Sequence, residues 1–104
     1  MIVVSVKEEG SSIVSLSIKG HGKMGYGKDI VCAGVSSCFV GALNALRDIE
    51  KFSVRIKEGD SYVKALAFPD EHDRTVLETL VIQLRTIQSS YPDTVEVVVS
   101  RKEG

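Results

Sequence analysis

The chain has 104 residues, of which 43% are hydrophobic and 26% are charged, and its formal net charge is −1. This composition is typical of a folded domain rather than of a disordered segment. The scaling of surface area with size predicts that folding buries roughly 65% of the chain's surface, which is enough for one hydrophobic core. We therefore expect a single domain over residues 1–104, too small for a multidomain enzyme or a large cofactor-binding fold.

The charge balance, the apolar runs and the cysteines narrow the class of protein further. A nearly neutral chain lacks the basic excess that phosphate binding needs, which argues against direct binding of nucleic acid. No apolar run reaches the roughly 18 residues of a membrane span, and the first residues lack the pattern of a signal peptide. Two cysteines do not make a disulfide scaffold, so we expect a cytoplasmic protein with both thiols free.

The first half of the chain predicts a β-hairpin, a glycine-rich loop and a helix. Apolar and polar residues alternate over 2–7 and over 14–19, which is the period of a strand with one buried face. A loop over 20–28 follows. The apolar residues of 30–49 then keep the three-and-four spacing of a helix that faces a core, and Asp29 is a suitable N-cap.

The second half repeats the order of two strands and a helix, and adds a last strand. Strands are predicted over 54–56 and 62–68, a helix from Pro69 and Asp70 to Tyr91, and a strand over 95–99. The order ββαββαβ predicts a two-layer α+β domain. Its two helices are expected on one face of a mixed or mostly antiparallel five-stranded sheet.

The strand–loop–helix unit gathers four residues that can carry chemistry, namely His21, Asp29, Cys32 and Ser36. If Asp29 is the N-cap, Cys32 lies in the first helical turn, where unpaired N–H groups and the helix dipole favour a thiolate. His21 stands eleven residues earlier, on a loop whose glycines let it fold over that helix end. The same N–H groups could hold an oxyanion, so the unit predicts a Cys–His site for acyl transfer.

Each of these residues also has a simpler interpretation. A histidine on a glycine-rich loop is usually exposed to solvent, and a cysteine in an apolar helix is more often inert packing. Cys38 fits the packing interpretation, because it lies about 240° around the helix from Cys32, whereas Ser36 shares the face of Cys32. His72 is expected on the surface, and no group of His and Cys has zinc-ligand spacing, so no metal site is predicted.

The glycine-rich loop also matches two nucleotide-binding motifs. Residues 20–25 match G-x-G-x-x-G, and residues 22–28 match the first seven positions of a P-loop. Both lack the expected context, because a hairpin precedes the loop and Asp29 stands where a P-loop has Ser or Thr. An alternative function stays open in which the chain is a non-enzymatic ribosome- or RNA-binding module. Its loop would contact phosphates through three lysines, Lys19, Lys23 and Lys28.

The loop and the start of the helix resemble the signature of a known family. The runs 20–22, 27–33 and 35–36 resemble the pattern G-H-A, glycine-rich spacer, G-x-D-I-V-C-A-x-V-S of the ribosomal-processing cysteine protease family Prp. The resemblance covers roughly positions 20–46. The chain departs from the pattern at Gly22, where Ala is common, and the extra glycine is expected to loosen the loop.

This resemblance implies a cytoplasmic cysteine endopeptidase, without metal or cofactor, that is typically a homodimer. Its substrate would be a large-subunit ribosomal protein precursor, from which it removes an N-terminal extension. Carried over by position, Cys32 would be the nucleophile and His21 the general base and later acid, with Asp29 and Ser36 as supporting residues. The loop would be a mobile cover that orders on substrate binding, and its glycines are Gly20, Gly22, Gly25 and Gly27.

Overall fold

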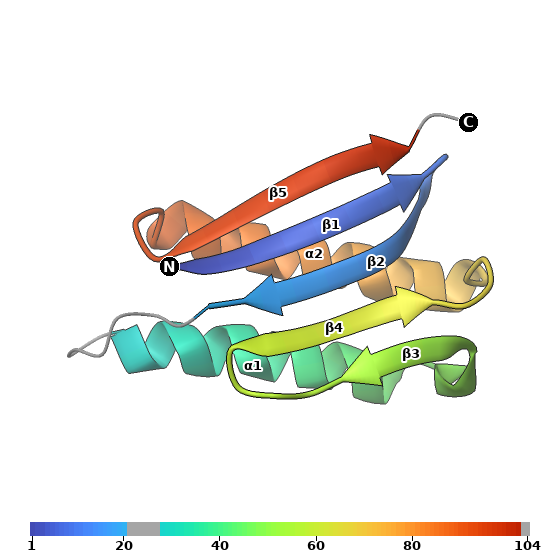
Figure 1. Cartoon of the computed structure of the whole chain (residues 1–104), viewed down its shortest axis with the longest axis horizontal. Helices are drawn as coiled ribbons and strands as arrows, with labels where there is room; N and C mark the ends of the chain where they lie inside the picture. The colour runs from blue at the N-terminus through green and yellow to red at the C-terminus, as the bar shows by residue number, and fades with distance from the viewer. Residues whose placement is uncertain (21–27, 103–104) are drawn as a thin grey trace.

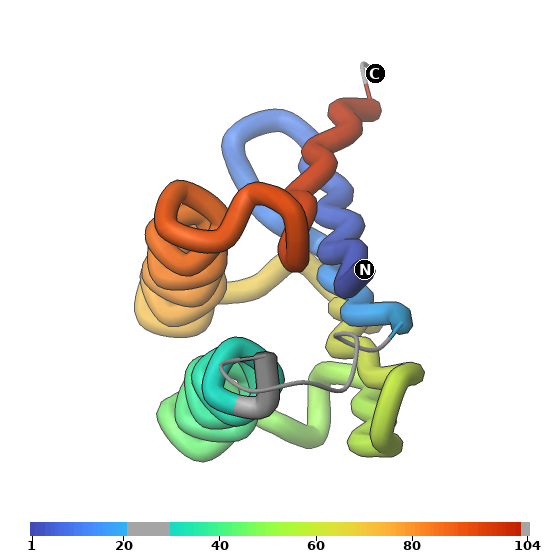
Figure 2. Tube along the Cα trace, turned by 90° about the vertical axis from the view of Figure 1, so that its left-hand side faces the viewer, coloured from blue at the N-terminus to red at the C-terminus, as the bar shows by residue number. Residues whose placement is uncertain are grey.

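The computed structural model describes residues 1–20 and 28–102. Their elements are β1 (Ile2–Glu9), β2 (Ser12–Lys19), α1 (Lys28–Ala45), the short 3₁₀-helix η1 (Ile49–Lys51), β3 (Phe52–Arg55), β4 (Asp60–Ala65), α2 (Glu71–Ser90) and β5 (Val95–Lys102). Both α-helices lie on one face of the sheet (Figure 1, Figure 2). The predicted two-layer α+β fold with the order ββαββαβ is therefore confirmed.

The sheet is mixed, which is one of the two arrangements that the sequence predicts. Its strand order is β3-β4-β2-β1-β5, with β5 parallel to β1 and the other neighbouring pairs antiparallel. Each α-helix joins two strands that point the same way, β2 to β3 through α1 and β4 to β5 through α2. The two crossovers start from oppositely directed strands and run in opposite directions across the sheet. Right-handed connections therefore place both helices on the same face.

The hairpin of β1 and β2 contains a β-bulge that sequence alternation did not reveal. Lys7 pairs with Ser15, but the next pair joins Glu8 to Ile13, so Val14 is an extra residue on β2. Beyond the bulge Ile13 takes the core-facing position with 4% exposure, while Val14 is only half-buried. The simple alternation predicted over 14–19 is correct only from Ser15 onward.

The helix α1 both begins and ends earlier in the sequence than predicted. It stops at Ala45 rather than Ile49, whose side chain is 46% exposed in η1. It begins at Lys28, so Asp29 lies within the helix and Cys32 is its fifth residue instead of its third. Most of the predicted core-facing stripe is buried, namely Val31, Val35, Phe39 and Ala42 on the helix and Leu46 just after its end.

The two strands in the middle of the chain are also offset from their predicted ranges. β3 ends at Arg55 and leaves Ile56 63% exposed, and β4 ends at Ala65 and leaves Phe68 68% exposed. The start of α2 agrees with its prediction, because the Asp70 side chain caps the helix and accepts a hydrogen bond from the Asp73 N–H at 2.9 Å. Among the described residues, no helix is both long and apolar enough to cross a membrane.

Candidate functional site

Three separate pieces of the chain meet around Cys32. The start of α1, the end of β2 and the connection between β3 and β4 lie at the same end of the molecule (Figure 1). Between them is a cleft of about 400 Å³, and both Cys32 and Ser36 line it. Cys32 is a half-buried free thiol that packs against the core on one side. The structure therefore brings these two predicted site residues into one cavity.

The walls of the cleft are mostly apolar. Val35 and Phe39 continue from Cys32 along α1 and belong to the core, while the exposed Ile56 forms part of the rim. Among the described residues, the charged ones that line the cleft are Lys57 and Glu58, both exposed on the β3–β4 connection. The described part of the cavity therefore offers a mostly nonpolar surface beside a thiol, with Ser36 and Ser61 among its polar lining residues.

Gly20 fixes the point at which the chain leaves β2 for the loop. Its φ angle is +95°, and a Cβ at this position would lie 2.3 Å from the carbonyl oxygen of Met1. The Gly20 N–H donates a hydrogen bond to the carbonyl oxygen of Gly59 at 3.0 Å. Only glycine combines this backbone conformation with this close approach. The residue just before His21 is thus held against both β1 and the β3–β4 connection.

Several predicted site residues lie outside the part of the chain that the structure describes. These are His21, Gly22, Gly25 and Gly27. Asp29 is placed as the second residue of α1, and its side chain is likewise outside the described part. The distance between His21 and Cys32, and the predicted role of the loop as a cover, therefore remain predictions.

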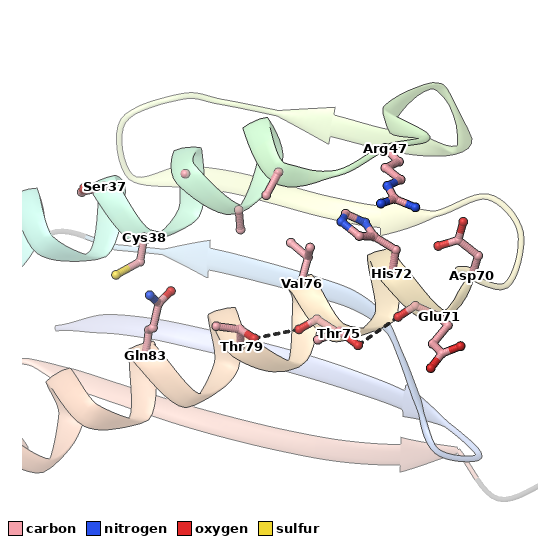
Figure 3. A pocket seen from close by; sticks show the side chains of 13 residues that line it. Ser37, Cys38, Arg47, Asp70, Glu71, His72, Thr75, Val76, Thr79 and Gln83 are labelled. Carbon is pink, nitrogen blue, oxygen red and sulfur yellow. Dashed lines mark hydrogen bonds between the residues drawn. The ribbon is translucent and has the colours of Figure 1, made fainter.

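The second cysteine belongs to a different cavity. Cys38 is half-buried and lines a groove of about 820 Å³ between α1 and α2 (Figure 3). The two thiols point into different cavities, as their angular separation along the helix predicts. The groove between the helices is the larger cavity, but it does not contain Cys32.

The far end of this groove contains a hydrogen-bonded pair that sequence reasoning missed. His72, predicted as a surface residue, is half-buried, and its Nδ1 lies 2.9 Å from Oδ1 of Asp73. Asp73 is only 1% exposed and also accepts hydrogen bonds from the backbone N–H groups of Arg47 at 2.9 Å and Asp48 at 3.1 Å. Figure 3 shows His72 and Arg47 at this end of the groove. The spacing Asp70-x-x-Asp73 predicts the N-terminus of a helix. It does not predict that the Asp73 carboxylate accepts hydrogen bonds from the segment that follows α1.

These contacts set the ionisation of Asp73. Burial alone would raise the pKa of its carboxyl group, because desolvation disfavours the charged form. The hydrogen bonds from Arg47, His72 and Asp48 outweigh burial, so the pKa lies below the ordinary value of 3.8. Asp73 is therefore a buried carboxylate that three donors hold in its charged form.

Asp73 is also the centre of an acidic cluster. One carboxylate oxygen each from Asp48, Asp70 and Asp73 lie within 4.8 Å of one another. Both oxygens of Asp73 and Oδ1 of Asp70 accept backbone N–H groups at the helix ends. These hydrogen bonds explain why the carboxylates lie together, because they cap the start of α2 and join it to the segment that follows α1.

A comparison with models of known protein families gives a match over most of the chain. The sequence model of the family described as "Cysteine protease Prp" matches residues 1–96. The chain belongs to the cysteine protease Prp family. The match includes the cleft around Cys32 and all elements up to the start of β5.

Curated relatives agree with this assignment. The chain is 26% identical over 99 residues to the ribosomal processing cysteine protease Prp of Staphylococcus aureus, covering 90% of this chain and 92% of that protein. It is 27% identical over 103 residues to the protein of the same name from Bacillus subtilis, with the same coverage. Both alignments therefore cover nearly the whole length of this chain and of each relative.

Solved structures share the fold. The crystal structure of Prp from Staphylococcus aureus with a covalently linked product peptide superposes with a TM-score of 0.84, at 24% identity, over 96% of this chain and 100% of that one. A crystal structure from Streptococcus mutans gives a TM-score of 0.81 at 23% identity, covering 98% of this chain and 99% of that one. The two-layer fold is thus shared with a Prp protease of known structure.

Proposed function

We propose that this member of the Prp family is an endopeptidase that removes the N-terminal extension of a large-subunit ribosomal protein precursor. Cys32 is its nucleophile and His21 its general base. The observation that carries the proposal is the position of Cys32, which lines an apolar cleft of about 400 Å³ near the start of α1. The end of β2 that leads directly into His21 borders the same cleft at Gly20.

The reaction follows the chemistry of a Cys–His dyad. His21 takes the proton of the Cys32 thiol, and the thiolate sulfur attacks the carbonyl carbon of the scissile peptide bond. The negative charge then moves to the carbonyl oxygen, where backbone N–H groups of the first turn of α1 can donate hydrogen bonds to it. When the C–N bond breaks, His21 returns the proton to the leaving amine. Water then hydrolyses the thioester and regenerates the thiol.

The remaining residues of the unit support this chemistry. Ser36 lines the cleft one helical turn beyond Cys32 and can hydrogen-bond to the bound peptide, while Asp29 near the start of α1 is a second supporting residue. The loop with Gly20, Gly22, Gly25 and Gly27 closes over the peptide and excludes water. The reaction needs no metal or cofactor, because the nucleophile and the proton carrier are both side chains.

The partners of the protein follow from the same proposal. A crystal structure of the Staphylococcus aureus Prp contains a substrate peptide, and the cleft of this chain, lined by α1 and the β3–β4 connection, is where we propose that the peptide lies. The apolar walls favour a peptide with nonpolar side chains near the scissile bond. We further propose that the protein is a homodimer and acts in the cytoplasm, where new ribosomal proteins are made.

Replacing each cysteine in turn tests the nucleophile. Cys32→Ala should lower the rate of cleavage of an extended ribosomal-protein precursor by at least about 1,000-fold, because no other group forms the thioester. Cys38→Ala is the matched control on the same helix and should keep the rate within about twofold, since Cys38 lines the other cavity. Cleavage is measured by gel or mass spectrometry, with circular dichroism to verify the fold. A Cys32→Ala protein that cleaves at the original rate would refute the proposal.

A further inference from the structure

The face of the sheet opposite the helices has an unequal distribution of charge. Along β1, β2 and β4 the residues that point away from the helices are mostly serine and lysine, and cross-strand pairing places Lys7 beside Ser15 and Ser15 beside Lys64. In the next row Ser5 pairs with Ser17, and Ser17 pairs with Tyr62. These two rows contain lysine, serine and tyrosine but no carboxylate on the three strands.

This face is hollowed at one end. A cavity of about 490 Å³ is lined by Lys7 on β1, by Val14 and Ser15 on β2, by Lys64 on β4, and by the segment 66–68 that follows β4. It lies at the end of the sheet opposite the cleft that contains Cys32 (Figure 1). The bulge at Val14 helps to form it by turning one extra residue of β2 away from the core.

The hollow combines cationic and aromatic groups. Its carboxylate, Glu9, lies 3.7 Å from the ammonium group of Lys102, which balances its charge. Lys64 holds its ammonium group over the ring of Tyr62, 4.5 Å from the centroid, so the charge stays close to the sheet. Phe68 is 68% exposed, and a phenyl ring left in water beside a cavity is a common sign of a binding surface.

We propose that this hollow binds single-stranded RNA. Lysine and serine side chains are common phosphate ligands, and an exposed aromatic ring on or beside a sheet is a stacking platform for a base. Lys7 and Lys64 contact phosphates, Ser15 donates a hydrogen bond to a phosphate oxygen, and Phe68 stacks on a base. The net charge of −1 belongs to the whole chain, whereas the hollow itself is lined by Lys7 and Lys64 and by one carboxylate, Glu9, which is paired with Lys102.

RNA is favoured over an acidic peptide by the chemistry of the surface. Lys7, Lys64 and Ser15 line the same hollow as the exposed ring of Phe68, and this combination suits a planar base beside its own phosphate. The surface is separate from the Cys32 cleft, so the enzyme could hold RNA while it cleaves a peptide. The proposal does not depend on which residue is the nucleophile.

Fluorescence anisotropy tests the proposal. The probe is a fluorescein-labelled oligouridylate of about 12 nucleotides, titrated with the full chain from about 50 to about 200 mM salt. We expect saturable binding that weakens with salt. The double variant Lys7→Gln, Lys64→Gln should bind at least about tenfold more weakly and have a salt slope lower by about 1.4, because two phosphate contacts are lost. Phe68→Ala should weaken binding about fivefold or more at every salt concentration.

Matched controls make the result decisive. The double variant Arg74→Gln, Arg85→Gln removes the same charge from α2, on the other side of the molecule, and should bind RNA like the unmodified chain. All variants should cleave the precursor peptide at the original rate, which also shows that they are folded. The proposal is wrong if the unmodified chain does not bind at about 50 mM salt. It is also wrong if the α2 control loses equal affinity, or if an oligoglutamate of equal length displaces RNA as well as unlabelled RNA does.

Discussion

A single buried carboxylate connects the two helices. A charge with 1% exposure would cost several kcal/mol if left unpaired, yet Asp73 has two backbone N–H donors from the segment after α1 and a third donor in His72. Its own N–H is bound by the cap residue Asp70. The segment after α1 and the first turn of α2 therefore share one hydrogen-bonded residue, and this explains why α1 ends at Ala45 although apolar residues continue to Ile49.

The charge of Asp73 makes stability depend on acid. Because its pKa is lowered below 3.8 in the folded state, the stabilisation is fully present above about that pH and is lost as the pH falls through the lower folded-state pKa. Asp73→Asn should lower the free energy of unfolding at pH 7 by about 1–3 kcal/mol, because an amide nitrogen then faces a backbone N–H. It should also flatten the loss of stability in acid.

Urea denaturation across the range from neutral to strongly acidic pH measures both effects. Asp93→Asn, at an exposed position in the turn before β5, is the control and should change the free energy of unfolding by less than about 0.5 kcal/mol. If Asp73→Asn and the unmodified chain lost stability in parallel as the pH falls, the ionised form of Asp73 would not be what stabilises the helix junction.

At the scale of elements, the site is assembled where β1, β2 and the β3–β4 connection meet the start of α1. Gly20 is the contact point, since it touches the Met1 carbonyl on one side and donates to Gly59 on the other. The residues that Gly20 meets are far from it in sequence, Met1 by 19 positions and Gly59 by 39. The position from which the loop begins is therefore set by long-range packing and not by the loop's own residues.

Replacing Gly20 should show how much this contact contributes. Gly20→Ala must accommodate both a φ of +95° and a Cβ placed 2.3 Å from a backbone oxygen. Gly10→Ala is the matched control, because Gly10 has a φ of +60° and nothing within 4 Å of its Cβ position. We expect Gly10→Ala to cost about 1 kcal/mol for its backbone conformation alone, and Gly20→Ala to cost clearly more.

Activity separates a local from a global effect of these changes. Gly20→Ala should also lower kcat for precursor cleavage, because the strand end that leads to His21 must shift, whereas Gly10→Ala should leave kcat unchanged. Thermal denaturation gives the stability and initial rates give kcat. Equal losses of stability in both variants would mean that the Met1 contact adds nothing.

At the scale of the whole molecule, local sequence patterns were sufficient to predict some structural features and insufficient to predict others. The periodicity of the chain predicted the five strands and the two α-helices of the described residues but not the short η1, and the spacing of Cys32, Ser36 and Cys38 predicted which of them share a cavity. The bulge at Val14, the buried role of Asp73 and the true end of α1 were not predictable. The last two depend on contacts between distant parts of the chain, since Arg47 and Asp73 are 26 positions apart. The bulge arises from the register of the β1–β2 hairpin, which the alternation of residue types does not specify.

The core and the cleft share residues, and this has a measurable consequence. Phe39 is 2% exposed in the core and also lines the cleft around Cys32, whereas Leu80 is fully buried on α2 and lines none of the cavities described above. Phe39→Leu and Leu80→Val should each lower the free energy of unfolding by about 1 kcal/mol, because each shortens a packed side chain. Only Phe39→Leu should also raise KM, since it reshapes the apolar wall against which the peptide lies. Urea denaturation and precursor cleavage, measured where both variants are folded, test this difference, and a KM that rises equally in both would place the peptide elsewhere on the molecule.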